Sequence, residues 1–482
     1  MNEQALSQTV TQTQIALNVV WTILAACLVM FMQSGFALLE TGFSRTKNVA
    51  HTMALNFLVY SIAVIGYWLI GFGLQMGGVG SVSSLGLTSG LSQEFAIVLG
   101  GKTHGLFGTT GFCTPPGVLT PAVAALFMFQ FVFMATAATI VTGAMLERWR
   151  FVAFMLLSFV VATLIYPIYA NWVWGGGFLS TLGKTFGLGH GHVDFAGSSV
   201  VHMTGGVVAF VGASLLGPRY GKFDRAGEPR AIPAHNIPMI VTGTFILAFG
   251  WFGFNAGSTL SGMDTRLAVI AFNTMLASAA GAISGTLWSW KRFGKPDVTM
   301  MCNGMLAGLV AITAPCAFVA AWSALLIGAM AGMLVIESTL LVERRLRIDD
   351  PVGAISVHGA CGSFGALAVG IFADGSYGAG LNGVAGNVTG VLYGDPGQLI
   401  AQLVGMGSNL VWVGTMASAS FLLIERLTGH RPALRDELRG LDISEMGMEG
   451  YFAEPSEPAT RVSIHSEEDA YTREYPIAAG RE

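Results

Sequence analysis

Charged residues are scarce in this sequence. Asp, Glu, Lys and Arg make up 11% of the 482 residues, whereas soluble domains average about 25%. The net charge of −4 offers no basic surface for nucleic acid. Hydrophobic residues instead make up 53% of the chain, and 64 residues are glycine, which lets helices approach closely in lipid. This composition excludes an ordinary soluble enzyme and indicates a bundle of membrane-spanning helices.

Cysteine is also rare. Only five occur, and Cys113 alone lies in a polar segment, whereas the other four lie in or beside apolar runs. This spacing matches neither a disulfide framework nor a zinc site. We therefore expect small buried thiols, with no metal and no cofactor.

Long apolar runs dominate the chain. A helix needs about 20 apolar residues to cross roughly 30 Å of hydrocarbon. Eleven runs qualify, at approximately 15–42, 51–77, 120–146, 151–171, 195–217, 235–257, 267–290, 298–317, 318–342, 354–373 and 398–425. The eighth and ninth are the hardest to separate, because Pro315 lies in the short join between them. The sequence predicts an all-α membrane protein with eleven transmembrane helices.

Basic residues predict the orientation of these helices. With the N-terminus placed outside, 21 of the 24 Lys and Arg residues fall in the inside loops and the tail, and only Lys102, Lys184 and Arg266 stay outside. Basic residues concentrate on the cytoplasmic side of membrane proteins. We therefore predict a multi-pass protein of the plasma or inner membrane, with an outside N-terminus and a cytoplasmic C-terminus.

The chain changes character after the last apolar run. Residues 1–427 form the predicted membrane domain, whereas residues 428–482 are charged and end in a stretch rich in Ser, Glu and Pro. We expect a cytoplasmic regulatory tail that is helical at its start and disordered toward its end. The outer loop at about 78–119 is long, and the sequence suggests no role for it.

An internal repeat links two distant segments. Residues 194–202 read DFAGSSVVH and residues 350–358 read DPVGAISVH, and a glycine follows each histidine by four residues. One segment opens the fifth predicted helix and the other opens the tenth, so the two run through the membrane in opposite directions. This is the signature of an inverted repeat. The predicted architecture is thus a 5+5 inverted repeat plus one further helix.

The repeat predicts a central histidine pair. Each His lies eight residues after its Asp, or about 12 Å along a helix, and half the hydrocarbon thickness is about 15 Å. His202 and His358 should therefore both stop near the membrane midplane, where ionisable residues usually line a path. Two separate structural histidines and a metal site remain alternatives, although the sequence shows no third ligand at suitable spacing.

Two acidic residues lie inside apolar runs. Glu40 ends the first predicted helix and Glu337 lies late in the ninth. We interpret both as structural partners of the basic residues in nearby loops.

Several motifs resemble those of the ammonium transporter (Amt/Mep/Rh) family, on its Amt side. Besides the two repeat segments, they include FALLETG at 36–42, Phe129-Gln130 followed by Phe133, WGGG at 174–177, WFGFNAGS at 251–258 and GLD at 440–442. The similarity extends over nearly the whole chain.

This resemblance implies a role for each matching residue. His202 and His358 correspond to twin pore histidines, and Phe254 to a ring that stacks on Phe133 to gate the pore. The outer ammonium site would consist of Trp174, Phe129, Phe133, Ser258 and the acidic Asp194. The family also implies a homotrimer with one pore per subunit, and a PII-type signalling protein as a possible cytoplasmic partner. One departure concerns the tail, where Glu445-Met446-Gly447 replaces a Glu-His-Gly step.

Four functions remain open on this reading. The first is a transporter that recruits ammonium, deprotonates it and conducts ammonia. The second is an ammonium sensor of the same fold, and the third is a gas channel, against which the outer cation site argues. An enzyme is the fourth, but no nucleophile or carboxylate lies at the depth of the histidines.

Overall fold

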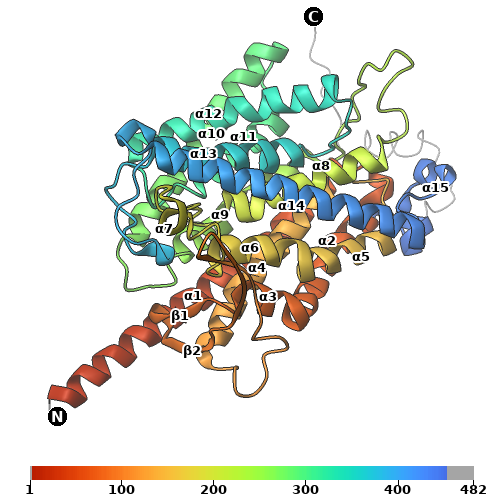
Figure 1. Ribbon diagram of the computed structural model, residues 1–482. Helices are drawn as coiled ribbons and strands as arrows, with labels where there is room; N and C mark the ends of the chain where they lie inside the picture. Colours follow the sequence, from red (N-terminus) through yellow and green to blue (C-terminus); the bar gives the residue numbers. More distant parts are fainter. Residues whose placement is uncertain (1–2, 453–482) are drawn as a thin grey trace, which may run out of the picture.

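The computed structural model describes residues 3–452 and is a bundle of long helices (Figure 1). Within this part, ten helical units are long and apolar enough to cross a membrane. They are α1 (Glu3–Phe43), η1–α2–η2–α3 (Thr46–Met76), α4 (Pro121–Ala144), α5–η4–α6 (Phe151–Trp174), η5–α8 (Ser198–Leu216), α9 (Ile237–Gly257), α10 (Leu267–Phe293), α12–η6 (Ala321–Arg345), η7–α13 (Ile355–Phe372) and α14 (Pro396–Thr428). The prediction of a helical membrane protein is confirmed.

The eighth predicted helix is shorter than expected. The run at 298–317 forms α11 (Val298–Ile312), which begins at the Asp297 cap and ends before Pro315. A proline disfavours helical backbone at the residue before it, so the helix gives way to turns there. With α11 only 15 residues long, the count of eleven membrane-crossing helices stays a prediction.

Several of these units contain a short π-helical segment. These segments are η2 (Tyr67–Gly71), η4 (Val161–Ile165), η5 (Ser198–Met203), η6 (Leu341–Arg345) and η7 (Ile355–Ala360). The periodicity of apolar residues does not show such segments, although they occur frequently at functional sites. Both predicted pore histidines lie in one, His202 in η5 and His358 in η7.

Glycines allow the helices to pack backbone against backbone. Between α1 and α9, a side chain on Gly243 would place its Cβ 2.6 Å from the carbonyl oxygen of Gly35. A Cβ atom on Gly253 would lie 2.7 Å from the carbonyl oxygen of Ala25. Close approach through small residues is the usual way in which helices associate in lipid.

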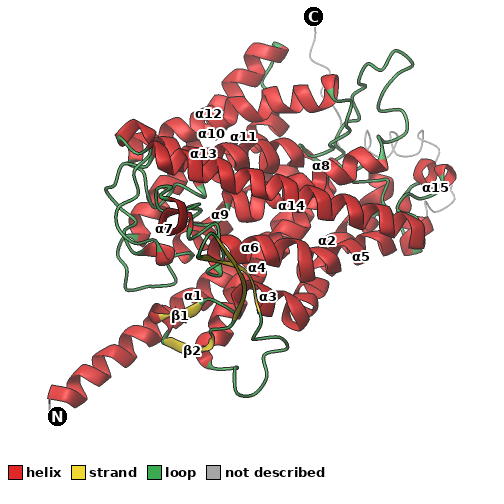
Figure 2. Cartoon of the chain, viewed as in Figure 1, coloured by secondary structure: helices red, strands yellow, loops and turns green. Residues whose placement is uncertain are grey.

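Two small β-hairpins form the segment that the sequence left without a role (Figure 2). β1 (Gly80–Val82) pairs with β2 (Leu87–Leu91), and β3 (Glu94–Leu99) pairs with β4 (Lys102–Gly108), both antiparallel. They lie at the end of the bundle that also carries α7 (Leu182–Phe186), on the left of Figure 1. We call this the vestibule end.

The opposite end carries the tail. α15 (Leu434–Arg439) and η10 (Asp442–Met446) lie on the right of Figure 1, and η10 packs beside the start of α2 (Val49–Gly66). The Asp442 carboxylate accepts a hydrogen bond from the His51 backbone N–H at 2.8 Å, and the Asn48 side chain accepts one from the Leu441 N–H at 2.8 Å. The helical start of the tail is thus confirmed, whereas the stretch predicted as disordered, from 453 onward, lies outside the described residues.

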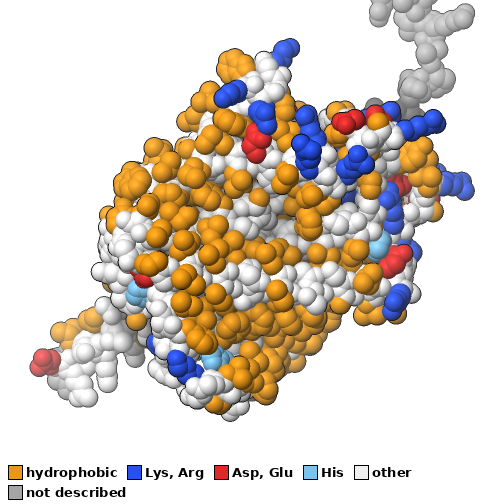
Figure 3. All heavy atoms as spheres, turned by 45° about the horizontal axis from the view of Figure 1, so that its top comes forward, with side chains coloured by type: hydrophobic (Ala, Val, Ile, Leu, Met, Phe, Trp, Pro, Cys, Tyr) orange, Lys and Arg blue, Asp and Glu red, His pale blue; other side chains and the backbone are white. Residues whose placement is uncertain are grey.

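Basic residues gather at this tail end, and apolar side chains cover much of the bundle between the two ends (Figure 3). A buried ion-pair cluster joins three loops there: Arg219 pairs with Asp349 at 2.8 Å, and Arg148 and Glu147 lie within 4 Å of the same pair. Burial by itself raises the pKa of Asp349, but the Arg148 and Arg219 guanidinium groups outweigh burial and hold this pKa well below its usual value. Which side of the membrane this end faces stays a prediction.

Candidate functional site

A large cavity opens at the vestibule end. Its volume is about 1140 Å³, and we call it the vestibule. All five residues predicted for the outer site line it: Phe129, Phe133, Trp174, Asp194 and Ser258. They come from α4, from the end of α6 (Tyr166–Trp174), from the loop before η5 and from the C-terminal end of α9, so the fold brings four separate segments to one cavity.

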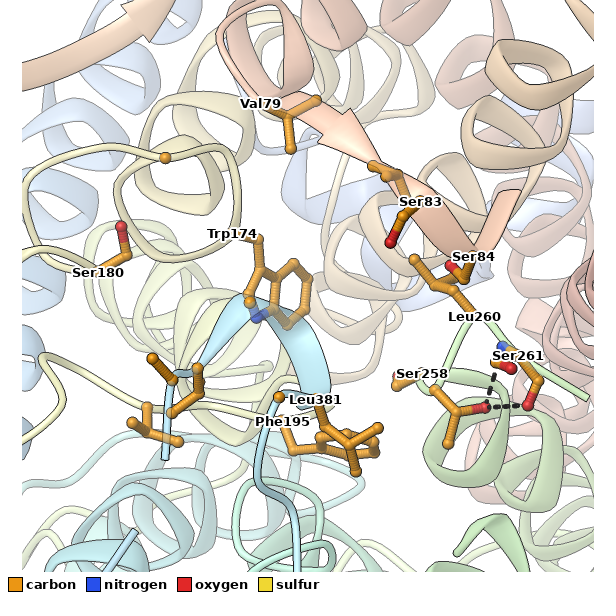
Figure 4. A pocket seen from close by; sticks show the side chains of 18 of the residues that line it. Val79, Ser83, Ser84, Trp174, Ser180, Phe195, Ser258, Leu260, Ser261 and Leu381 are labelled. Carbon is orange, nitrogen blue, oxygen red and sulfur yellow. Dashed lines mark hydrogen bonds between the residues drawn. The ribbon is translucent and has the colours of Figure 1, made fainter. Parts of the chain in front are cut away.

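Trp174 and Ser258 present to the vestibule an aromatic face and a hydroxyl oxygen, two groups that suit a cation (Figure 4). The Trp174 Nε1–H donates to the Asp194 carbonyl oxygen at 2.7 Å, which fixes the orientation of the indole. The Ser258 hydroxyl donates to the Phe254 carbonyl oxygen at 2.8 Å. Its single proton is thereby used, and its oxygen keeps lone pairs that can accept a hydrogen bond from a ligand.

Asp194 organises the start of η5. Its carboxylate accepts hydrogen bonds from the backbone N–H groups of residues 197, 198, 199 and 200, at 2.7–3.0 Å, and from the Ser199 hydroxyl at 2.6 Å. These N–H groups have no partner inside their own helix. Asp194 therefore acts chiefly as a helix cap, while its negative charge lies beside the vestibule.

Phe129 and Phe133 line the vestibule, and Phe254 lies behind Phe133. Phe129 and Phe133 lie one turn apart on α4, with ring centroids 4.6 Å apart. The Phe133 ring lies against that of Phe254 on α9, with centroids 4.1 Å apart and the planes inclined by 31°. Phe133 and Phe254 are both buried. Phe133 and Phe254 thus form a tilted ring pair that lies between the vestibule and His202.

The two predicted pore histidines meet. The Nδ1 atoms of His202 and His358 lie 3.1 Å apart, and both side chains are buried. At this distance one nitrogen donates a hydrogen to the lone pair of the other, so the pair shares a single N–H at its centre. His202 also stacks on Trp251 and Phe254, with ring centroids 5.2 and 5.4 Å away.

The repeated sequence segment has a repeated local geometry. Asp350 caps η7 as Asp194 caps η5, and accepts hydrogen bonds from the N–H groups of Ala354 and Ile355 at 2.9 and 2.8 Å. The glycine three residues after each Asp adopts a left-handed backbone, with φ of 116° at Gly197 and 80° at Gly353, which glycine adopts without a steric penalty. The D-x-x-G pattern is therefore a cap and a turn.

The glycine four residues after each histidine holds the two copies together. A Cβ on Gly362 would lie 2.6 Å from the Ser198 carbonyl oxygen, and one on Gly206 would overlap the backbone of Gly359. Each copy thus packs backbone to backbone against the π-helical segment of the other. This reciprocal contact sets the separation of the histidines.

A second, small cavity lies on the tail side of the histidines. Its volume is about 20 Å³, and the residues that line it include His358, Glu40, Asn303 and Val352. A cavity of this size holds one water-sized molecule. The predicted pore residues therefore lie in order from the vestibule through the phenylalanine pair and the histidine pair to this inner cavity.

The structure differs from the sequence-based expectation at Glu40, and it adds Trp251 to the site. The interpretation of Glu40 as a partner of basic residues in nearby loops is wrong, because its carboxyl group contacts the Asn56 amide and the Thr142 hydroxyl instead. For Glu337 the interpretation is confirmed, since Glu337 pairs with Arg292 at 2.7 Å. Trp251 is a further residue of the site, since its ring stacks on His202. Its position three residues before Phe254, on the same helix face, is the sequence signal for this contact.

Comparison with known proteins identifies the family. The model of the ammonium transporter family matches residues 20–451. The ammonium transporter Amt2 of Archaeoglobus fulgidus is 45% identical over 440 residues, which cover 91% of this chain and 89% of that protein. An ammonium transporter of Aquifex aeolicus is 32% identical over 90% of this chain and 93% of its own length.

Solved structures agree with the sequence comparison. A structure described as a sensor Amt protein is 34% identical, with a TM-score of 0.77 over 90% of this chain and 99% of that one. Mep2 of Candida albicans is 28% identical, with a TM-score of 0.71 over 86% of this chain and 85% of that one. Proteins of this family are channels or transporters rather than enzymes. The chain, with its helical membrane bundle, therefore belongs to the ammonium transporter family.

Proposed function

We propose that this protein recruits ammonium in the vestibule, removes a proton from it and conducts ammonia past the histidine pair. The observation that carries this proposal is the continuous order of the site. A cation-binding vestibule leads to the stacked Phe133 and Phe254 rings, and these lead to the joined His202 and His358. The vestibule and the buried stretch below it suit different forms of the substrate.

The vestibule suits the charged form. Aromatic faces such as that of Trp174 attract a cation by about 0.5–2 kcal/mol each, depending on desolvation. The Ser258 oxygen can accept a hydrogen bond from ammonium, and Asp194 adds negative potential. Potassium resembles ammonium in size but makes no such hydrogen bond.

The buried stretch suits the neutral form. A cation in an apolar, membrane-buried passage is costly, whereas ammonia carries no charge and can still exchange hydrogen bonds with the histidines. Potassium has no proton to give up, so it cannot follow this route. The histidine pair would thus select by chemistry rather than by size.

Uptake by proteoliposomes tests this proposal. Purified protein should take up labelled methylammonium, in competition with ammonium but not with potassium, and measurements with and without a membrane potential will show whether charge crosses as well. Protein that inserts fully but gives no more uptake than empty vesicles would refute transport.

We further propose the orientation that the basic residues predict, and the assembly and regulation that the family resemblance implies. The vestibule end would face outside and the tail end the cytoplasm, as the basic loops favour. Three copies would form a homotrimer, with a PII-type protein as the cytoplasmic partner. Cross-linking in native membranes tests the trimer, and a pull-down from cytosol under ammonium excess tests the partner. The basic residues also serve topology alone, so recovery of no PII-type protein would remove this part.

An ammonium sensor is a second candidate. It is favoured by the similarity to a structure described as a sensor Amt protein, and by the docking of Leu441 and η10 at the start of α2. A sensor would show ammonium-dependent protection of residues 434–450 from hydrogen exchange, with little uptake. High uptake without any change in protection would favour the transporter.

A further inference from the structure

Glu40 is a buried carboxyl group at the inner end of the pore. It lies on α1, is 1% exposed and lines the small inner cavity together with His358. A molecule that leaves the histidine pair toward the tail end would enter this cavity next. Of the acidic side chains in the described part of the chain, Glu40 is the one that lines it.

Hydrogen-bond geometry indicates that this carboxyl group carries a proton. The Thr142 hydroxyl oxygen lies 2.6 Å from the Thr139 carbonyl oxygen and 2.7 and 2.5 Å from the two Glu40 oxygens. A hydroxyl has one hydrogen, and a carbonyl or a carboxylate can only accept. With an ionised Glu40, two acceptors would therefore compete for one hydrogen. With a protonated Glu40, the carboxyl O–H donates to Thr142, and Thr142 donates to Thr139.

The surroundings also favour a neutral group. The other side-chain partner of Glu40 is the Asn56 amide, which donates to its Oε2 at 2.7 Å. No ion pair involves Glu40 among residues 3–452, and a buried charge without a counter-charge is costly. The titratable or charged groups on the elements that contact α1 or line the cavity include His358, His51 on α2, Cys302 on α11, Asp350 at the start of η7, and the Arg45–Glu147 ion pair beyond the end of α1.

We infer that Glu40 is a proton-carrying residue of the pore, which protonates ammonia as it leaves the histidine pair. In this step the Glu40 O–H bond breaks and an N–H bond forms, so ammonia and the carboxylic acid become ammonium and a carboxylate. Glu40 then regains the proton that the incoming ammonium gave up, passed on through the histidine pair. The inference rests on the proposed function, and it makes the overall process the movement of one ammonium ion and one charge.

The test compares Glu40→Gln with Glu337→Gln, a matched control in which the carboxyl group is half-exposed and paired with Arg292. A glutamine keeps the size of the carboxylic acid and can donate to Thr142, but it cannot give up a proton. Transport current in proteoliposomes should fall about 100-fold in Glu40→Gln, the lower end of what a positioned proton donor contributes. The half-saturation concentration should stay unchanged, because the vestibule is intact. Glu337→Gln should behave as wild type in both respects.

Infrared difference spectroscopy supplies a readout that needs no transport. The carbonyl stretch of a protonated carboxylic acid should appear in the difference between the spectra of wild type and Glu40→Gln at neutral pH, and it should be absent from the difference between wild type and Glu337→Gln. The Glu94 carboxyl group is present in all three proteins and therefore cancels. If Glu40→Gln does not fold, Thr142→Val should shift this band by removing the hydrogen-bond partner. A band that is absent from wild type, or that neither variant alters, overturns the inference, as does an undiminished current in Glu40→Gln. Failure of the proposed function would instead appear as wild-type protein without any uptake.

Discussion

Replacement of Asp194 by alanine should cost more stability than the equivalent change at Asp350. The two residues occupy equivalent places in the repeat, so each is a control for the other. Asp194 accepts from four backbone N–H groups and the Ser199 hydroxyl, whereas Asp350 accepts from two N–H groups. In Asp194→Ala the Ser199 hydroxyl can turn to His192 Nε2, 2.8 Å away, so four donors lose their partner against two in Asp350→Ala.

The number of unpaired donors determines the size of the effect. A buried donor without a partner costs about 1–3 kcal/mol, and water in the vestibule can hydrate part of this site, so the lower end applies. The free energy of unfolding should then fall by about 4 kcal/mol in Asp194→Ala and by about 2 kcal/mol in Asp350→Ala. Because η5 also carries His202, Asp194→Ala should displace this histidine and reduce uptake.

Unfolding by sodium dodecyl sulfate in mixed micelles, followed by tryptophan fluorescence, measures both losses, and methylammonium uptake measures the effect on His202. Equal losses in the two variants would refute the donor count. A stability loss in Asp194→Ala without any loss of uptake would show that the cap does not position the histidine.

Three further predictions concern the vestibule and the pore. Trp174→Leu removes a cation–π face worth about 1–2 kcal/mol, so the half-saturation concentration for uptake should rise several-fold, whereas Trp412→Leu, outside the vestibule, should leave it unchanged; equal values in both would place the outer site elsewhere. His202→Ala should let water into the pore and lower either uptake or the exclusion of potassium; wild-type flux with intact exclusion would show that the pair is only structural. Burial raises the pKa of Glu94 from 4.5 to about 7, so the folded state holds a proton that the unfolded chain has released, and wild-type stability should fall as the pH rises across this interval. Glu94→Gln should remove that slope from a plot of melting temperature against pH, and parallel curves would contradict the assignment.

Hydrophobicity and repetition made much of the fold predictable from sequence. Long apolar runs have few alternatives to membrane helices, because a backbone in lipid must satisfy its own hydrogen bonds. The length of 298–317 was overestimated, since apolar character continues beyond the point at which Pro315 ends the helix. The hairpins at 80–108 lie between two of the long apolar runs, so the hydropathy of the sequence does not predict them.

The sequence by itself also determined which residues could form the central pair. Two copies of D-x-x-G-x-x-x-V-H place a cap, a turn and a histidine at equal depth whichever way each copy crosses the membrane. Only the tertiary structure decided that Nδ1 of His202 lies 3.1 Å from Nδ1 of His358, because this distance depends on the contacts of Gly206 and Gly362 across the repeat.

The surroundings of Glu40 likewise depended on the fold alone. In sequence it is an acidic residue at the end of an apolar run, close to Arg45 and Lys47, and proximity along the chain favoured an ion pair. The helix directs the side chain to Thr142 on α4 and Asn56 on α2 instead, while Arg45 turns to Glu147. Sequence sets which groups are available and how deep they lie along a helix; which of them meet is decided by the rotation and packing of helices distant in the chain.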